Sequence, residues 1–139
     1  MKYFFTIVFF GFFSILSADF HTDIYKGVSA AKKSGKIVSL FIVSSDCPHC
    51  KELLKLVDLD KDLGSLIMEK TELVILNTKD PLTEVPTDLP YKGRVPVFMT
   101  LTPNGKVVGK ALDGSISPAL IHSHIYKVTS LWDLWLRGQ

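Results

Sequence analysis

Apolar runs alternate along the chain with stretches that carry charges, glycines and prolines, and their lengths predict the elements of the fold. Residues 36–45 and 72–78 are apolar runs of strand length, rich in β-branched residues, as in strands buried on both faces. Residues 95–102 and 106–112 read as two further strands. Between them, the dipeptide Asn104-Gly105 indicates a two-residue hairpin turn. Four strands are therefore expected.

Apolar residues at helical spacing predict three helices around these strands. The first helix is expected at 21–35 and ends at a glycine, and the second begins at the two cysteines. The third begins with Ser117 as its N-cap and Pro118 as its first residue. Its inner face is expected to comprise Ile121, Ile125, Val128, Trp132 and Trp135. Three prolines make residues 79–95 a loop. This order predicts an α/β fold, with a central mixed sheet flanked by helices.

The first 18 residues differ from the rest in composition. Lys2 is followed by an uncharged apolar run to about Leu16, and small residues come next, a pattern typical of a secretory signal peptide. Cleavage is expected after Ser17 or Ala18, which leaves residues 19–139 as one domain. The alternative is a retained membrane anchor, although the run is shorter than the roughly 20 residues that span a bilayer.

The overall charge of the chain gives no support to two classes of partner. Its 139 residues contain 16 Lys and Arg against 14 Asp and Glu, a net charge of +2. This nearly neutral balance gives no electrostatic basis for binding nucleic acid or an anionic membrane. Export would place the cysteines in an oxidising compartment, where a thiol pair either forms a disulfide or is kept reduced.

The only two cysteines, Cys47 and Cys50, lie where a strand is expected to end and a helix to begin. Cys47 would face the free N–H groups and the positive dipole of the helix start, which stabilise a thiolate. Pro48 suits the first helical turn, and a protonated His49 would favour the thiolate further. Cys47 is thus the expected attacking thiolate, and Cys50 the shielded thiol that resolves a mixed disulfide.

These residues resemble a known family. The tetrapeptide CPHC is the same as the active site of the periplasmic oxidant DsbA, and residues 93–109 resemble the segment of thioredoxin that carries a cis-proline. The chain is thus identified as a member of the exported thioredoxin-like thiol–disulfide oxidoreductases. The resemblance implies a thioredoxin fold and a cis bond between Val95 and Pro96, whose backbone would bind the substrate chain.

Two positions depart from the family pattern. Thioredoxin and DsbA bury an acidic residue six positions before the first cysteine, where this chain has Phe41. Thioredoxin has a tryptophan directly before the first cysteine, where this chain has Asp46. The acid serves the family as a proton acceptor for the second thiol, so in this chain that relay is expected to be missing or to be supplied by another residue. The carboxylate of Asp46 would oppose ionisation of the adjacent thiol.

The main alternative function is an exported metal chaperone. Cys47 and Cys50 would bind copper or zinc, with His49, His122 or His124 as a further ligand. A calcium loop over 58–69 is weaker, because the position that needs glycine is Leu63 and the segment reads as an irregular helix end. Haem attachment is excluded, because no histidine follows the second cysteine.

The sequence therefore predicts a periplasmic thiol–disulfide oxidoreductase that needs no bound cofactor or metal. Its expected partners are proteins with thiols or disulfides, together with a membrane redox protein that recycles it, and it is expected to be a monomer. The direction of electron flow stays open, since the Pro-His pair favours oxidation and the small domain favours reduction.

Overall fold

The structure is a computed structural model that describes residues 20–138. The predicted signal peptide, residues 1–18, lies outside the described residues. Within the described part, no helix is both long and apolar enough to cross a membrane. The elements in chain order are α2 (Ile24–Ser34), β1 (Ile37–Val43), α3 (Pro48–Leu59), α4 (Lys61–Lys70), β2 (Thr71–Asn77), β3 (Val97–Leu101), β4 (Val107–Asp113) and α5 (Pro118–Arg137).

The four strands form one mixed sheet in the order β2-β1-β3-β4. Strand β1 pairs in parallel with β2 and antiparallel with β3, and β3 pairs antiparallel with β4. Every residue of β1 and of β3 is buried, as expected for strands covered on both faces. The predicted mixed sheet flanked by helices is thus confirmed.

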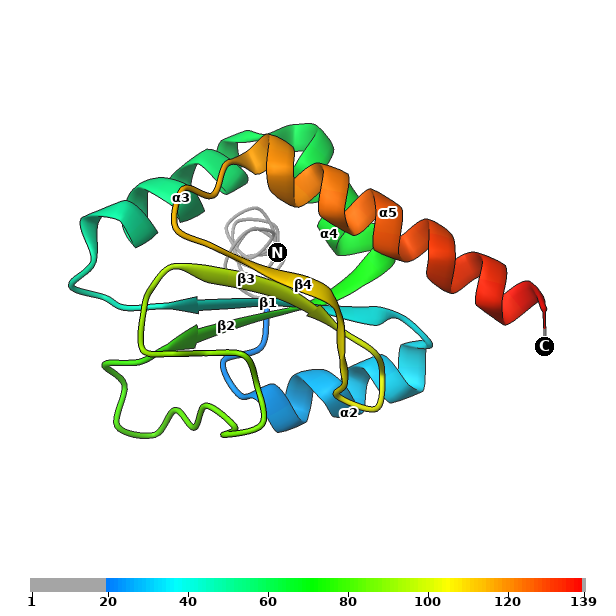
Figure 1. Ribbon diagram of the computed structural model, residues 1–139, viewed down its shortest axis with the longest axis horizontal. Coiled ribbons are helices and arrows are strands. Elements are labelled where there is room, and N and C mark those ends of the chain that lie inside the picture. The colour runs from blue at the N-terminus through cyan, green and yellow to red at the C-terminus, as the bar shows by residue number, and fades with distance from the viewer. Residues whose placement is uncertain (1–19, 139) are drawn as a thin grey trace, which may run out of the picture.

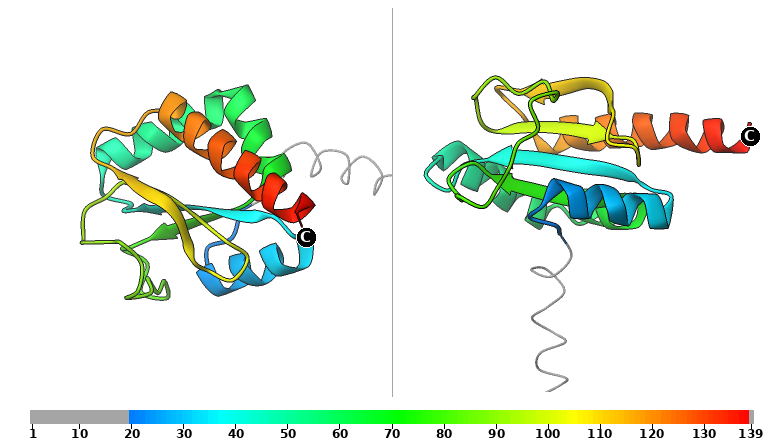
Figure 2. Two further views of the ribbon diagram at one scale, coloured as in Figure 1. Left: turned by 45° about the vertical axis from the view of Figure 1, so that its right-hand side comes forward. Right: turned by 90° about the horizontal axis from the view of Figure 1, so that it is seen from below.

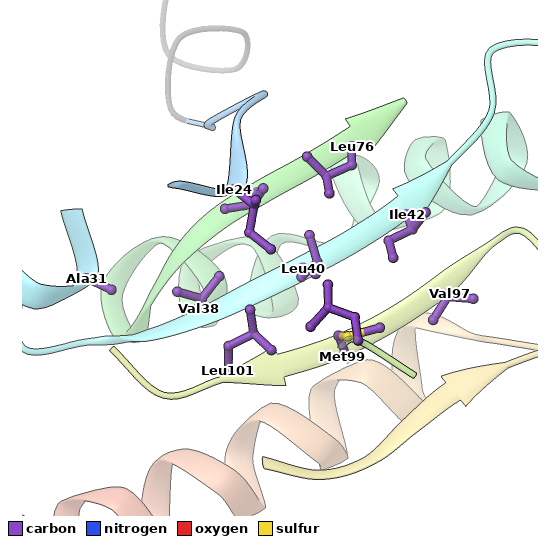
Figure 3. Close-up of a cluster of buried hydrophobic side chains, with 11 residues drawn as sticks. Ile24, Ala31, Val38, Leu40, Ile42, Leu76, Val97, Met99 and Leu101 are labelled. Atoms are coloured by element: carbon purple, nitrogen blue, oxygen red, sulfur yellow. The ribbon is translucent and has the colours of Figure 1, made fainter. Parts of the chain in front are cut away.

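Helices cover the two faces of the sheet unequally, with α2 on one face and α3, α4 and α5 on the other (Figure 1). Alternate residues of β1 therefore enter two different cores. Val38, Leu40 and Ile42 face α2 in the first core, which Figure 3 shows. Phe41 and Val43 face α3 and α5 in the second core, which also contains Cys50.

Two helix predictions need correction. The first helix begins at Ile24 and not at residue 21, because the Asp23 side chain accepts the N–H of Tyr25 at 2.8 Å and caps the helix. The segment read as an irregular helix end is the regular helix α4. Asp60 begins it by accepting the N–H of Leu63 at 3.0 Å, and the apolar side chain of Leu63 is fully buried.

The turn between β3 and β4 and the inner face of α5 also differ from prediction. The hairpin turn between β3 and β4 has three residues, because the N–H of Thr102 bonds the carbonyl of Lys106 at 2.8 Å and Gly105 adopts a φ of 83°. Helix α5 begins at Pro118 as predicted, but Trp135 is 54% exposed and is not part of its inner face. Helix α5 continues past the surface on which it packs.

Candidate functional site

Cys47 is the N-cap residue of α3, four residues after the end of β1. Its backbone is extended, with a φ of −98° and a ψ of 109°, and Pro48 occupies the first helical turn. The Cys47 sulfur accepts the N–H of Cys50 at 3.2 Å, so it takes the capping position that an Asp or Ser side chain usually fills. Cys47 is partly exposed, so this sulfur lies at the positive end of a helix and within reach of a substrate.

Cys50 is the buried partner, only 1% exposed. Both cysteines are free thiols in the structure. Burial raises the pKa of the Cys50 thiol to about 11, and the sulfur of Cys47 contributes to the rise. The backbone of Ser44 acts in the opposite direction by hydrogen bonding. The two thiols are therefore unequal in exposure, as the sequence predicts.

The surroundings of Cys50 include a phenylalanine at the position where the family that the sequence resembles carries an acid. Phe41 is 1% exposed and lies in the same core cluster as Cys50. Its ring contacts that of Phe98, with the ring centroids 4.8 Å apart. Position 41 therefore holds an apolar core residue where the resemblance would place a proton acceptor.

Asp46 lies directly before Cys47 and contacts two polar neighbours. It accepts a hydrogen bond from the Ser44 hydroxyl, and its second carboxylate oxygen lies 3.4 Å from the ammonium of Lys79. Both contacts lower the pKa of the Asp46 carboxyl, that from Ser44 most strongly. Lys79 belongs to the loop after β2, so no local pattern could have predicted it. The pair places a compensated negative charge beside Cys47.

The remaining predicted site residues lie at the same end of the sheet. His49 and Pro48 are exposed on the first turn of α3. The peptide bond between Val95 and Pro96 is cis. Val95 packs against the cluster that Cys47 also contacts, so this loop and the start of α3 adjoin a common core. The structure brings all six predicted residues to the carboxyl end of β1.

His124 of α5 packs against the sheet. The ring of His124 lies 3.1 Å from the Thr100 hydroxyl and stands edge-on to Phe98, so it packs against the sheet. Desolvation lowers its pKa. Within residues 20–138, no group of three or more His, Cys, Asp or Glu side chains is placed to hold a metal ion. The metal-chaperone alternative thus has only the two thiols as ligands in this part of the chain.

Solved structures of similar shape identify the fold. A disulphide isomerase from Xylella fastidiosa Temecula1 superposes with a TM-score of 0.55 at 20% identity, covering 76% of this chain and 88% of that one. A thioredoxin from Thermus thermophilus gives a TM-score of 0.60 at 19% identity, with coverages of 79% and 87%. The oxidoreductase DsbH gives 0.55 at 15% identity, with coverages of 86% and 89%.

No family model and no curated protein matches this sequence. At these identities the structural likeness establishes the architecture and leaves the chemistry to the residues of the site. The chain has the thioredoxin fold, with a CxxC pair at the start of α3.

Proposed function

We propose that the protein is a thiol–disulfide oxidoreductase that exchanges disulfides with protein substrates through Cys47 and Cys50. The observation that carries the proposal is the inequality of the two sulfurs. One is partly exposed and caps a helix, where it accepts an N–H at 3.2 Å. The other is buried beneath it, with a pKa raised to about 11. This combination suits an attacking thiolate and a resolving thiol.

The exchange proceeds in two steps when the substrate is a disulfide. The Cys47 thiolate attacks one substrate sulfur, a bond forms between the two, and the substrate S–S bond breaks to release a thiolate that takes up a proton. Cys50 then loses its proton and attacks the Cys47 sulfur. The Cys47–Cys50 bond forms, the mixed disulfide breaks, and the second substrate thiolate leaves. Two electrons pass from the dithiol to the substrate.

The same steps run in reverse when the substrate is a dithiol, which then becomes oxidised as the Cys47–Cys50 disulfide is reduced. The reduction potential of the pair relative to the substrate sets the direction. No other redox group is required, because the two sulfurs carry both electrons. Continued turnover needs a partner that restores the starting redox state, and for an exported protein we assign this role to a membrane redox protein.

The other predicted residues have supporting roles in this proposal. Exposed His49, when protonated, adds positive potential beside the thiolate, and Pro48 fixes the entry of the chain into α3. The backbone of Val95 and Pro96 would pair with an extended substrate segment. The predicted export signal places this exchange in the periplasm, where disulfides persist.

Two serine variants test the proposal. Reduced Cys50→Ser should retain the attack and accumulate a mixed disulfide with a disulfide-containing substrate such as insulin, visible by non-reducing electrophoresis. Cys47→Ser should form no such adduct and should lose insulin reduction. Because the two substitutions are chemically identical and three residues apart, each serves as the control for the other. Activity that survives in Cys47→Ser would disprove the assignment.

The same protein preparation tests the metal chaperone. Tight, stoichiometric copper binding by the reduced wild-type protein, together with no insulin reduction, would favour that alternative. A reduction potential measured in glutathione buffers then assigns the direction of electron flow, since a strongly oxidising value indicates a dithiol oxidase and a thioredoxin-like value a reductase.

A further inference from the structure

The carboxyl end of α5 projects beyond the rest of the fold and exposes large apolar side chains. Figures 1 and 2 show the last turns of this helix extending past the sheet. Leu131, Leu134, Trp135 and Leu136, here called the apolar tip, are 55%, 61%, 54% and 45% exposed. Apolar side chains of this size gathered at one place on a surface mark an interaction site.

Basic residues lie on the elements next to the last turns of α5. The indole N–H of Trp132 donates to the carbonyl of Gly35 at 3.1 Å, which fixes the base of the tip against the end of α2. The last turn of α2 carries two exposed lysines, and the start of β1 lies beside the end of α4 through the pairing of Ile37 with Thr71. The residues called here the basic pole are Lys32, Lys33, Lys36, Lys70 and Arg137.

We infer that the apolar tip and the basic pole together form a docking surface for an anionic phospholipid bilayer. Leucines and tryptophans on a helix end partition into the boundary between headgroups and acyl chains, and nearby lysines and arginines are attracted to anionic headgroups. The segments that form the basic pole and the tip, 32–37, 69–71 and 131–137, contain five basic residues and two acidic ones, Asp133 and Glu69. Although the chain as a whole is nearly neutral, this surface thus matches a bilayer in both apolar character and sign of charge.

A second copy of the chain fits this surface less well. A stable interface buries about 1,600 Å² with roughly 20–30 residues on each side, whereas the tip is the end of a single helix. In a two-fold contact the same patch meets itself, so the basic pole of one copy would face that of the other. An apolar tip beside a group of like charges is therefore better matched by a fluid, negatively charged surface.

Docking in this way would orient the thiol pair. The basic pole includes Lys36 directly before β1, and Cys47 lies after the opposite end of that strand. A seven-residue strand is roughly 23 Å long. The bilayer and the thiols would thus lie at opposite ends of the sheet, and the pair would face the aqueous side.

Tryptophan fluorescence tests the inference directly, because the chain has only two tryptophans and both lie in the last turns of α5. The full chain is mixed with POPC vesicles or with POPC vesicles that contain POPG. We expect a blue shift in emission, and quenching by acyl-brominated lipid, with the POPG vesicles at low salt. Because the signal comes from Trp132 and Trp135, it reports contact of the tip itself.

Matched variants separate the tip from general adhesion. Lys32→Glu with Lys33→Glu should weaken POPG binding at least about 30-fold, because the loss of two cations alone predicts that factor and the two new carboxylates are repelled by the anionic surface. Lys51→Glu with Lys55→Glu makes the same charge change on α3 and should leave binding unchanged. Trp135→Ser with Leu136→Ser should weaken binding at least about tenfold. Tyr126 is an exposed aromatic residue nearer the start of α5, and Tyr126→Ser should leave vesicle binding unchanged.

Several results would overturn the inference. One is the absence of a spectral shift or quenching with POPG vesicles, and another is equal weakening by the two lysine pairs. Self-association that depends on Trp135, measured by sedimentation without lipid and accompanied by no vesicle binding, would assign the surface to a second copy.

Discussion

Raising the pH should destabilise the reduced protein through Cys50. Burial raises the pKa of this thiol from 9.0 to about 11, so the folded chain holds its proton more tightly than the unfolded chain. Both states are protonated below pH 9.0, where the full stabilisation is present. Between 9.0 and about 11 the unfolded state loses the proton first, so stability falls as the pH rises. A pKa difference of this size corresponds to roughly 3 kcal/mol.

Urea unfolding of the reduced wild type and of Cys50→Ala measures this loss. The free energy of unfolding is followed from below pH 9.0 to above 11, and the difference between the two proteins cancels the tyrosines and lysines that titrate in the same range. We expect the advantage of the wild type to shrink by roughly 3 kcal/mol over this window. Parallel curves for the two proteins would refute the reasoning.

Cys47→Ala then separates the causes of the raised pKa. Desolvation is the largest cause and persists in this variant, whereas the contributions from the Cys47 sulfur disappear. The dependence on pH should therefore become weaker without vanishing. The same division applies during turnover, because Cys47 is uncharged in a mixed disulfide. Since Cys50 attacks as a thiolate, resolution should accelerate up to about tenfold per pH unit below its pKa.

Three further experiments with substitutions test other parts of the structure. Gly27→Ala places a Cβ 2.2 Å from a methyl group of buried Val74 and should lower the free energy of unfolding by about 1–3 kcal/mol. Gly64→Ala, in α4 with nothing within 4 Å of the added Cβ, should raise it by about 0.5–1 kcal/mol. Equal effects of the two substitutions in urea unfolding would contradict the packing. Asp46→Asn removes a negative charge beside Cys47 and should speed its alkylation by iodoacetamide about two- to fivefold at low salt. Lys79→Gln should slow the alkylation, because Lys79 no longer compensates the carboxylate of Asp46. An unchanged rate in both variants would show that Asp46 has no influence on the thiolate. Thr100→Val removes a hydroxyl that lies 3.1 Å from His124 and donates to the Val108 carbonyl at 3.0 Å. The substitution should lower the free energy of unfolding, measured with urea, by about 1 kcal/mol. An unchanged free energy would show that these two hydrogen bonds do not stabilise the fold.

The sequence predicted the elements whose signals are local. The strand β1 is apolar throughout, and Ser117 and Pro118 mark the start of α5 by capping chemistry alone. Signals that depend on distant partners were read less well. Helical periodicity placed Trp135 on the inner face of α5, but periodicity does not reveal where the packing partner of a helix ends. The partner of Asp46 was likewise hidden, because Lys79 reaches it from a separate loop.

Phe41 connects the packing of this fold with its chemistry. Because side chains alternate along β1, position 41 faces the core that contains Cys50, whereas Leu40 and Ile42 face the opposite core. A phenylalanine there packs against Phe98 and leaves no ionisable group from β1 beside the buried thiol. Burial then raises the pKa of Cys50, and no side chain of β1 can accept its proton. In the proposed mechanism Cys50 must lose this proton before it attacks, so the residue that completes the core makes the resolving step sensitive to pH.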